Sequence, residues 1–284
     1  VPAYVDNGVM HFILFTAIFV YGSNFGADLY DFGIIYEIFP ELIATLNCCG
    51  FALSFFMYFK GLYFPSTNDS GTTGSLLADF VWGTELYPRV LGVDIKRFVN
   101  CRFSMTLWQL AGLSFCYASF KQHNVVDYGL LLSAISQYLY LAKFFWWEIG
   151  YMRSIDIIVD RAGFEIQWGC LVFVPAVYTF HTRLCVQSPS QLSLPVALGI
   201  FIVGMSGVYF NFEADMQRQR FREAEGRMQV WGRDPVFVKA SYTTTDPATG
   251  ELEHRTSLLL ASGYWGVARH FHYAFELVAA WSWC

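Results

Sequence analysis

Long runs without any charged side chain are the feature that most limits the folds open to this chain. The longest, residues 184–212, holds 29 consecutive residues without Asp, Glu, Lys or Arg. Only 14% of all residues are charged, against about 25% in ordinary soluble domains. An apolar stretch of about 20 residues can cross the hydrocarbon core of a bilayer as a helix, which satisfies its own backbone hydrogen bonds. The sequence therefore predicts an all-α, polytopic helical transmembrane protein.

The apolar runs predict six full spans and a truncated seventh. The first five occupy residues 6–28, 41–60, 103–120, 128–147 and 166–182. A turn is expected at Pro189 and Pro195, and the sixth span occupies the rest of residues 184–212. A further apolar segment starts at Thr256, but the chain ends eight residues after Glu276. We therefore expect this chain to be a fragment that lacks a C-terminal end.

Lys and Arg are distributed unequally between the predicted loops. The loops after spans two, four and six hold fourteen of these residues, whereas those after spans one, three and five hold only Lys121 and Arg183. Because basic loops are retained in the cytoplasm, this distribution predicts a cytosolic amino end. It also predicts one membrane domain over residues 1–284, with residues 213–257 as a cytosolic segment inside it.

The net charge argues against a nucleic acid partner, and the cysteines argue against a metal site. A net charge of −5 provides no cationic field for nucleic acid phosphates, so we expect no nucleic acid partner. The seven cysteines include no C-x-x-C pair and lie mostly in or beside apolar runs. We interpret them as small hydrophobic residues and predict no metal site.

Three polar clusters interrupt the apolar pattern, and the first is residues 143–170. It places Glu148, Arg153 and Asp160 among aromatic side chains. One interpretation is an interfacial loop with ion pairs that neutralise one another. The other is a pocket that supplies a proton, because a carboxyl group in apolar surroundings has a raised pKa and can act as an acid.

The second cluster is the arginine-rich segment 215–235. Arg218 and Arg222 are four residues apart and share a helix face, where they can bind a phosphate. Binding of anionic lipid head groups explains the same pattern. The threonine-rich alternation that follows, with the turn sequence DPATG at 246–250, predicts a short cytosolic hairpin.

The third cluster is residues 262–281, where polar and aromatic side chains enter a new apolar segment: Trp265, Arg269, His270, His272 and Tyr273. It fits either an interfacial anchor or a nucleotide site. On a helix, histidines two residues apart point to different sides, which argues against a metal pair. No G-x-G-x-x-G follows a strand, so any dinucleotide must be held without a Rossmann fold.

Five segments occur in an order that allows comparison with known families. They are YFKGLYFPSTNDSG (58–71), WGTELYPRVLGVDIKRFVNCRFSMTLW (82–108), FFWWEIGYMRSIDIIVDRAGFEIQWGCLVFVPAVYT (144–179), QRQRFR with WGRDP (217–235) and LLLASGYWGVARHFHY (258–273). Together they resemble the integral-membrane sterol reductases, which reduce a Δ7 or Δ14 double bond and include the lamin B receptor. GTELYP, NCRF, KASYTTT and WGVARHFHY are most similar to the plant and algal branch that acts on the Δ7 bond.

The resemblance implies NADPH as cofactor, a sterol substrate, surrounding membrane lipid and a multi-pass location in the endoplasmic reticulum membrane. Contacts with the NADPH phosphates would come from the stretch that contains Gln217, Arg218, Phe221 and Arg222. The remaining cofactor-site residues would be Trp265, Arg269, His270, His272 and Tyr273.

Several positions depart from the family pattern. Val159 stands where relatives usually have a histidine, Glu165 where a tyrosine often follows Gly-Phe, and Glu276 where relatives carry Asp. Relatives also continue beyond Cys284 with residues that complete the NADPH pocket and the sterol pocket. We therefore expect the chain by itself to be inactive.

Reduction of an unactivated C=C bond needs an acid as well as a hydride donor. We predict Tyr178 as the acid, with Glu148 or Asp160 as the relay that supplies its proton. Three other readings are a Δ14-sterol reductase, a membrane methyltransferase of the isoprenylcysteine type with a similar Arg-His-x-x-Tyr motif, and a non-catalytic sterol-binding membrane protein. A transporter is a fourth, for which we find no inverted repeat.

Overall fold

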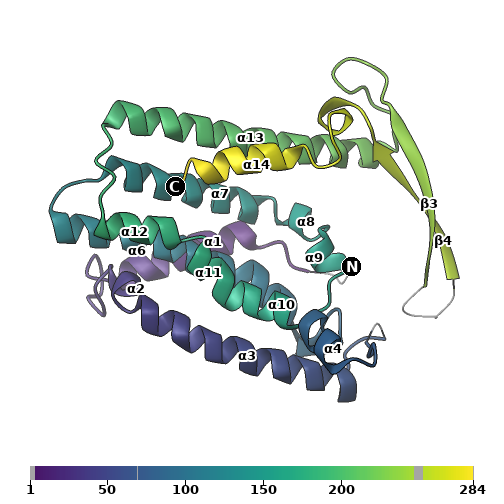
Figure 1. Cartoon of the computed structure of the whole chain (residues 1–284), viewed down its shortest axis with the longest axis horizontal. Helices are drawn as coiled ribbons and strands as arrows, with labels where there is room; N and C mark the ends of the chain where they lie inside the picture. Colours follow the sequence, from purple (N-terminus) through teal and green to yellow (C-terminus); the bar gives the residue numbers. More distant parts are fainter. Residues whose placement is uncertain (1–3, 69, 246–251, 284) are drawn as a thin grey trace. The chain divides into compact units, whose positions relative to one another are not determined.

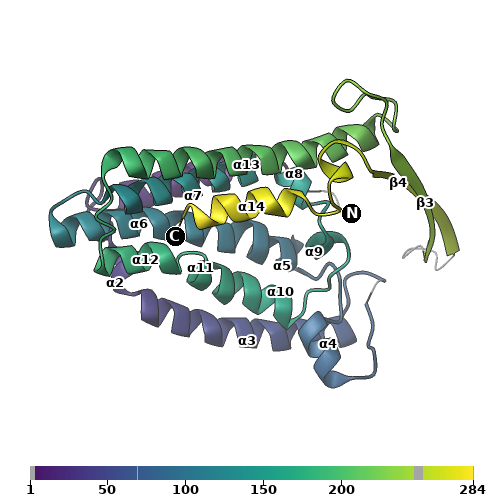
Figure 2. The same cartoon turned by 45° about the horizontal axis from the view of Figure 1, so that its top comes forward.

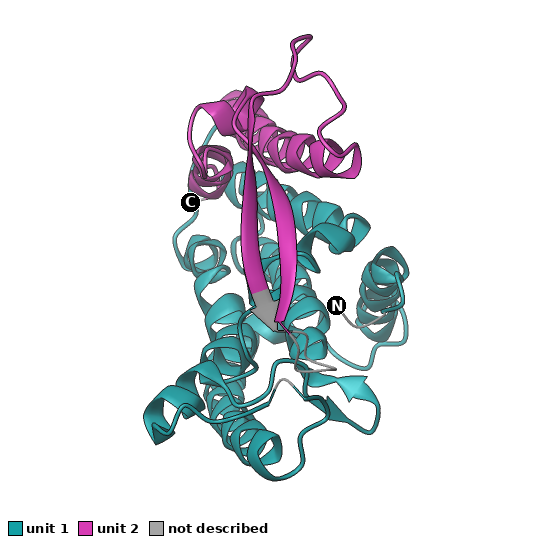
Figure 3. Ribbon diagram, turned by 90° about the vertical axis from the view of Figure 1, so that its right-hand side faces the viewer, with its two compact units in different colours: residues 1–193 teal, residues 194–284 magenta. Residues whose placement is uncertain are grey.

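The computed structural model describes residues 4–68, 70–245 and 252–283. The described chain is mostly helical and divides into two compact units, residues 1–193 and 194–284 (Figure 3). The prediction of a single membrane domain with a cytosolic segment at 213–257 stays a prediction.

Unit 1 is built from helices whose apolar runs were visible in the sequence (Figure 1). Its longer helices are α1 (Gly8–Gly22), α3 (Phe39–Tyr63), α6 (Met105–His123) and α7 (Tyr128–Trp146). Its shorter helices are α2 (Ile34–Glu37), α4 (Leu76–Trp82), α5 (Ile95–Arg97), α8 (Glu148–Tyr151), α9 (Ile155–Ile158), α10 (Phe164–Trp168), α11 (Val174–Val177) and α12 (Phe180–Gln187). Two π-helical stretches, Phe98–Ser104 and Gly169–Phe173, join α5 to α6 and α10 to α11.

Hydrogen bonds between apolar helices connect α1 to its neighbours. The His11 Nε2 atom lies 2.8 Å from the Thr106 hydroxyl of α6. Thr16 of α1 accepts a hydrogen bond from Gln109 at 2.5 Å and lies 3.1 Å from the hydroxyl of Tyr138 in α7. Such contacts hold helices together in lipid, where apolar packing alone gives little selectivity.

The predicted spans coincide with helices. By length and composition, three helical stretches within the described residues are apolar enough to cross a membrane, namely Phe39–Tyr63, Phe164–Gln187 and Leu194–Glu223, and α1 is a shorter apolar helix. The predicted turn is confirmed, since α12 ends at Gln187 and the next helix begins at Leu194 with Pro195 in its first turn. The total of six full spans stays a prediction.

Unit 2 consists of two packed helices and a hairpin (Figures 1 and 2). The helices are α13 (Leu194–Glu223) and α14 (His272–Trp281), which lie side by side in both views. They approach closely at Gly207, where an added Cβ would lie 2.8 Å from the Phe275 carbonyl oxygen. A larger side chain there would separate the helices.

The hairpin predicted within the polar segment is confirmed as β3 (Phe237–Thr245) and β4 (Leu252–Leu260). The strands are antiparallel, with Phe237 opposite Leu260. The predicted DPATG turn lies outside the described residues, and the cytosolic location of the hairpin stays a prediction. A second, smaller hairpin was not predicted: β1 (Arg89–Val90) pairs with β2 (Val93–Asp94) in unit 1.

Candidate functional site

The carboxyl end of α13 carries the arginine-rich motif, which a buried phenylalanine fixes to the hairpin. Phe221 is fully buried and packs with Val230 and Leu260. One residue further on, the Arg222 Nε atom donates to the Leu258 carbonyl of β4 at 3.4 Å. The motif is therefore held at the base of the hairpin.

Trp265 lies against the same end of α13. Its indole N–H donates to the Ala214 carbonyl at 2.7 Å. The Arg218 guanidinium lies 4.4 Å from the centroid of the indole ring, and its Nη2 atom donates to Asp215 Oδ1 at 2.9 Å. Cation–π contact and ion pair together fix the direction of Arg218.

Gln217 connects α13 to the 3₁₀ turn η3 (Gly263–Gly266) that carries Trp265. Its side-chain oxygen accepts the backbone N–H of Tyr264 at 3.0 Å. Gly263 has φ +64°, and a Cβ at this position would lie 2.2 Å from that same oxygen. A glycine is required here both for the backbone conformation and for the space that Gln217 occupies.

Replacing Gly263 by Ala is expected to destabilise unit 2 by about 2 kcal/mol, because the backbone becomes strained and Gln217 must leave Tyr264. Gly199→Ala is the matched control, since its Cβ would meet nothing within 4 Å on the regular helix α13. Thermal unfolding in detergent measures both. Equal midpoints for the two variants would contradict the role given to Gln217.

His270, His272 and Tyr273 form a group of aromatic rings in contact next to Trp265. The His272 ring centroid lies 5.0 Å from Trp265, and His270 stacks on Tyr273 at 5.2 Å with planes 8° apart. The two histidine centroids are only 5.9 Å apart. The helical geometry expected to separate them does not apply, because His270 lies in the turn before α14. His272 Nδ1 is buried without a hydrogen-bond partner, while Arg269 is exposed.

Glu148 is fully buried at the start of α8. Both of its carboxylate oxygens accept hydrogen bonds from Arg102, of which the one from Nη2 measures 3.0 Å. Arg102 also donates to the Asn7 side chain at 2.9 Å. Glu148 therefore belongs to an ion pair that ties the segment before α1 to α8.

Tyr178 and Asp160, the other two residues predicted to take part in proton transfer, have different neighbours from Glu148. Tyr178 lies between α11 and α12, 42% exposed, with its ring 4.9 Å from Trp108. The Trp108 indole N–H donates to Gln137 at 2.8 Å. The backbone carbonyl of Asp160 accepts from the buried Lys96 ammonium at 2.5 Å, and its side chain is half-buried.

Sequence reasoning gave no role to Arg102 or Asp215, the partners of Glu148 and Arg218. The three-residue spacing between Asp215 and Arg218 on a helix was an available signal for their ion pair. Arg102 and Glu148 are 46 residues apart, so spacing carried no such signal.

The cluster of Arg218, Arg222, Trp265, His272 and Tyr273 in unit 2 presents guanidinium groups beside aromatic rings. This combination suits a ligand that carries both phosphates and planar rings. Among residues 4–68, 70–245 and 252–283, no three metal-ligating side chains come together. The described strands form only antiparallel hairpins, so the parallel sheet of a Rossmann fold does not occur among them.

Comparison with known proteins gives the family. Residues 3–284 match the model described as "Ergosterol biosynthesis ERG4/ERG24 family". The chain is 41% identical over 283 residues to a 7-dehydrocholesterol reductase of Arabidopsis thaliana, covering 99% of this chain and 64% of that protein. It is 34% identical over 253 residues to the enzyme of the same name from Danio rerio, covering 88% of this chain and 52% of that protein.

A third relative carries a different name. The chain is 31% identical over 281 residues to a Delta(14)-sterol reductase of Methylotuvimicrobium alcaliphilum, covering 99% of this chain and 62% of that protein. The chain thus spans between half and two thirds of the length of these relatives. The match along nearly its whole length shows that this chain belongs to the ERG4/ERG24 family of sterol reductases.

Proposed function

We propose that the protein containing this chain is a multi-pass enzyme of the endoplasmic reticulum membrane that reduces the C7=C8 bond of Δ5,7-sterols with NADPH. The observation that carries the proposal is the contact of Arg218 with Trp265, because it joins two motifs 47 residues apart in the sequence. The names of the Arabidopsis and Danio relatives support the choice of the Δ7 bond.

The residues of unit 2 fit an NADPH molecule. Arg218, Arg222 and Arg269 would hold its phosphates, and the buried, unpartnered Nδ1 atom of His272 offers a polar contact within the same cluster. Trp265 and Tyr273 provide aromatic surface for a planar ring. NADPH supplies the hydride when it is bound.

The residues of unit 1 supply the acid that the reaction needs in addition to the hydride donor. We assign the acid to Tyr178, whose phenol would donate a proton to one alkene carbon of the sterol. Aromatic side chains near it, including Trp108 and Phe173, would stabilise positive charge on the substrate and exclude water. A supporting part in the supply of that proton is assigned to Asp160, whereas both carboxylate oxygens of Glu148 already accept hydrogen bonds from Arg102.

Expression of the complete open reading frame in yeast that accumulates Δ7-sterols tests the function. Loss of the Δ7 bond, followed by mass spectrometry of the sterols and dependent on NADPH in membranes, is the expected result. In a second strain that accumulates Δ14-sterols, loss of the Δ14 bond would favour the activity named for the Methylotuvimicrobium relative. A methylated prenylcysteine, or no product at all, would reject sterol reduction.

Replacing Arg218 by Gln in the complete protein is expected to raise the KM for NADPH about 10- to 100-fold. The loss of hydrogen bonds from a cation to phosphate amounts to about 1.5–3 kcal/mol. Arg227→Gln is the control, because Arg227 is exposed and pairs with Glu225, its neighbour two residues away. Titration of NADPH in the sterol assay measures both variants, and an unchanged KM in Arg218→Gln would remove Arg218 from the cofactor site.

A further inference from the structure

The loop between α3 and α5 presents an unusual set of exposed apolar side chains. Leu91 is 99% exposed, and Phe64, Leu76 and Leu77 are each at least 70% exposed. These residues follow the apolar helix α3. A loop exposed to water would ordinarily be polar. Contiguous exposed apolar surface commonly marks a binding surface for a membrane or a protein.

Leu91 is also strained. It and Gly92 form the turn between β1 and β2, with φ values of +50° and +82°. Two-residue turns with both φ values positive favour Asn-Gly or Gly-Gly. A leucine in this conformation costs about 1–2 kcal/mol, and at 99% exposure it recovers none of that by packing within the described chain.

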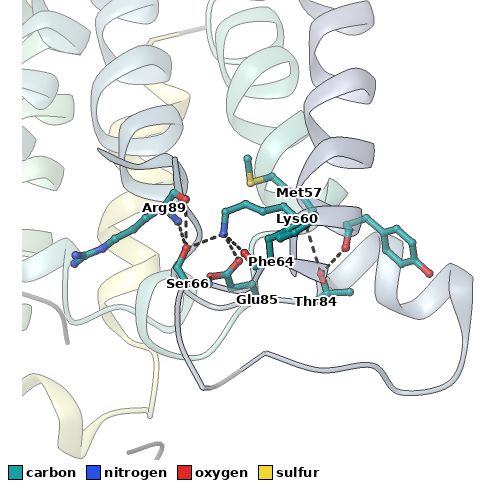
Figure 4. Close-up of polar contacts among 8 residues, drawn as sticks. Met57, Lys60, Phe64, Ser66, Thr84, Glu85 and Arg89 are labelled. Atoms are coloured by element: carbon teal, nitrogen blue, oxygen red, sulfur yellow. Dashed lines mark hydrogen bonds and ion pairs between the residues drawn. The ribbon is translucent and has the colours of Figure 1, made fainter. Parts of the chain in front are cut away.

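A polar network around the buried Glu85 connects this hairpin to the end of α3 (Figure 4). Lys60, in the last turn of α3, pairs with the buried Glu85 at 2.7 Å and donates to the Ser66 hydroxyl at 2.7 Å. That hydroxyl accepts the backbone N–H of Arg89, the first residue of β1, at 3.0 Å. Figure 4 draws Arg89 connected to Lys60 of α3 through Ser66.

Helix α4 is fixed to the same end of unit 1. Phe80 of α4 packs on Phe55, eight residues before the end of α3, with centroids 4.6 Å apart. The hydroxyl of Thr72 and the backbone N–H of Thr73 donate to Asp79 and hold the pKa of its carboxyl below the usual range. The loop therefore folds back along α3.

The length of α3 sets the depth of these side chains. Its 25 residues extend about 37 Å, against about 30 Å of hydrocarbon and 40–45 Å including head groups. The end of α3 would therefore lie in the head-group layer, about 5–8 Å thick. Leu91 is two residues from Arg89, or about 7 Å along a strand, so the turn stays within reach of this layer.

We infer that the loop formed by residues 64–68 and 70–94 is a lipid anchor, in which Leu91 and the first turn of α4 insert into the interface of the bilayer. The exposed Arg89 lies on the same hairpin and would face anionic phosphate groups. The network of Lys60, Glu85 and Ser66 holds the anchor at constant depth. Lipid contact gives the strained leucine an apolar environment that the described chain does not provide.

Photo-crosslinking in the complete protein tests this anchor. A benzophenone amino acid replaces Leu91 in protein reconstituted into nanodiscs that contain anionic phospholipid, and adducts are identified by mass spectrometry. Glu253, a half-exposed charged residue of β4, is the control position. We expect lipid adducts from position 91 in clear excess over position 253.

Two other outcomes would overturn the anchor. Adducts with polypeptide, either a second copy or another part of the complete protein, would show that protein covers Leu91. Equal lipid yields from both positions would show no preferred insertion. Position 76, in the first turn of α4, is the second reporter if the variant at position 91 does not fold.

Discussion

Replacing Arg102 by Met is expected to destabilise the protein by about 3–5 kcal/mol, because the buried Glu148 carboxylate loses its cation. The Arg102 side chain is 18% exposed and that of Glu148 is fully buried, so water cannot replace the guanidinium. For a chain of this size the change lowers the unfolding midpoint by roughly 10 °C. Thermal unfolding followed by circular dichroism in detergent measures it.

Lys121→Met is the matched control, since it breaks an ion pair at the surface. Lys121 Nζ lies 2.8 Å from Asp31 Oδ2, and its side chain is 52% exposed. A pair this exposed contributes little to stability, because water and salt screen it. Equal losses in the two single variants would contradict the burial seen for Glu148.

The double variant Arg102→Met with Glu148→Met tests whether the lost stability comes from leaving the Glu148 carboxylate buried without a cation or from the absence of the ion pair itself. Removing both charges leaves no buried ion, so we expect most of the stability to return. This result would favour a structural role for Glu148. A carboxylate whose two oxygens both accept from a guanidinium is poorly placed to pass a proton to Tyr178.

The helices could be predicted because each apolar run must satisfy its own backbone in a bilayer. The boundary between α12 and α13 followed from Pro189 and Pro195, and the β3–β4 hairpin followed from alternation of threonines with other residues. The β1–β2 hairpin could not be predicted, because its turn places Leu91 where local propensity favours Asn or Gly.

The candidate site was predicted in part. The four-residue spacing placed Arg218 and Arg222 on one helix, but only the fold shows that Trp265 packs on Arg218. A contact between residues 47 positions apart depends on the hairpin that returns the chain to α13, and spacing carries no such information. Similarly, a helical pattern could not place His270, because that residue lies in a turn.

Tyr178 is the residue whose loss should most affect turnover. Its ring packs on Trp108, which is hydrogen-bonded to Gln137, and the Gln137 amide donates to the Thr182 hydroxyl at 3.2 Å. A polar network within apolar helices is costly unless it is satisfied, and such networks often serve proton transfer. Tyr178 is thus an exposed phenol beside a buried polar network.

Replacing Tyr178 by Phe in the complete protein is expected to lower turnover about 10²- to 10⁴-fold, the usual contribution of a positioned acid. The KM for NADPH should not change, because the phenol would act on the sterol in the chemical step and would not hold the cofactor. Tyr140→Phe is the control, since Tyr140 also packs on Trp108, at 5.8 Å, and loses the same hydroxyl. If both variants lost turnover equally, the effect would belong to packing around Trp108; if Tyr178→Phe kept full turnover, another group would have to protonate the sterol.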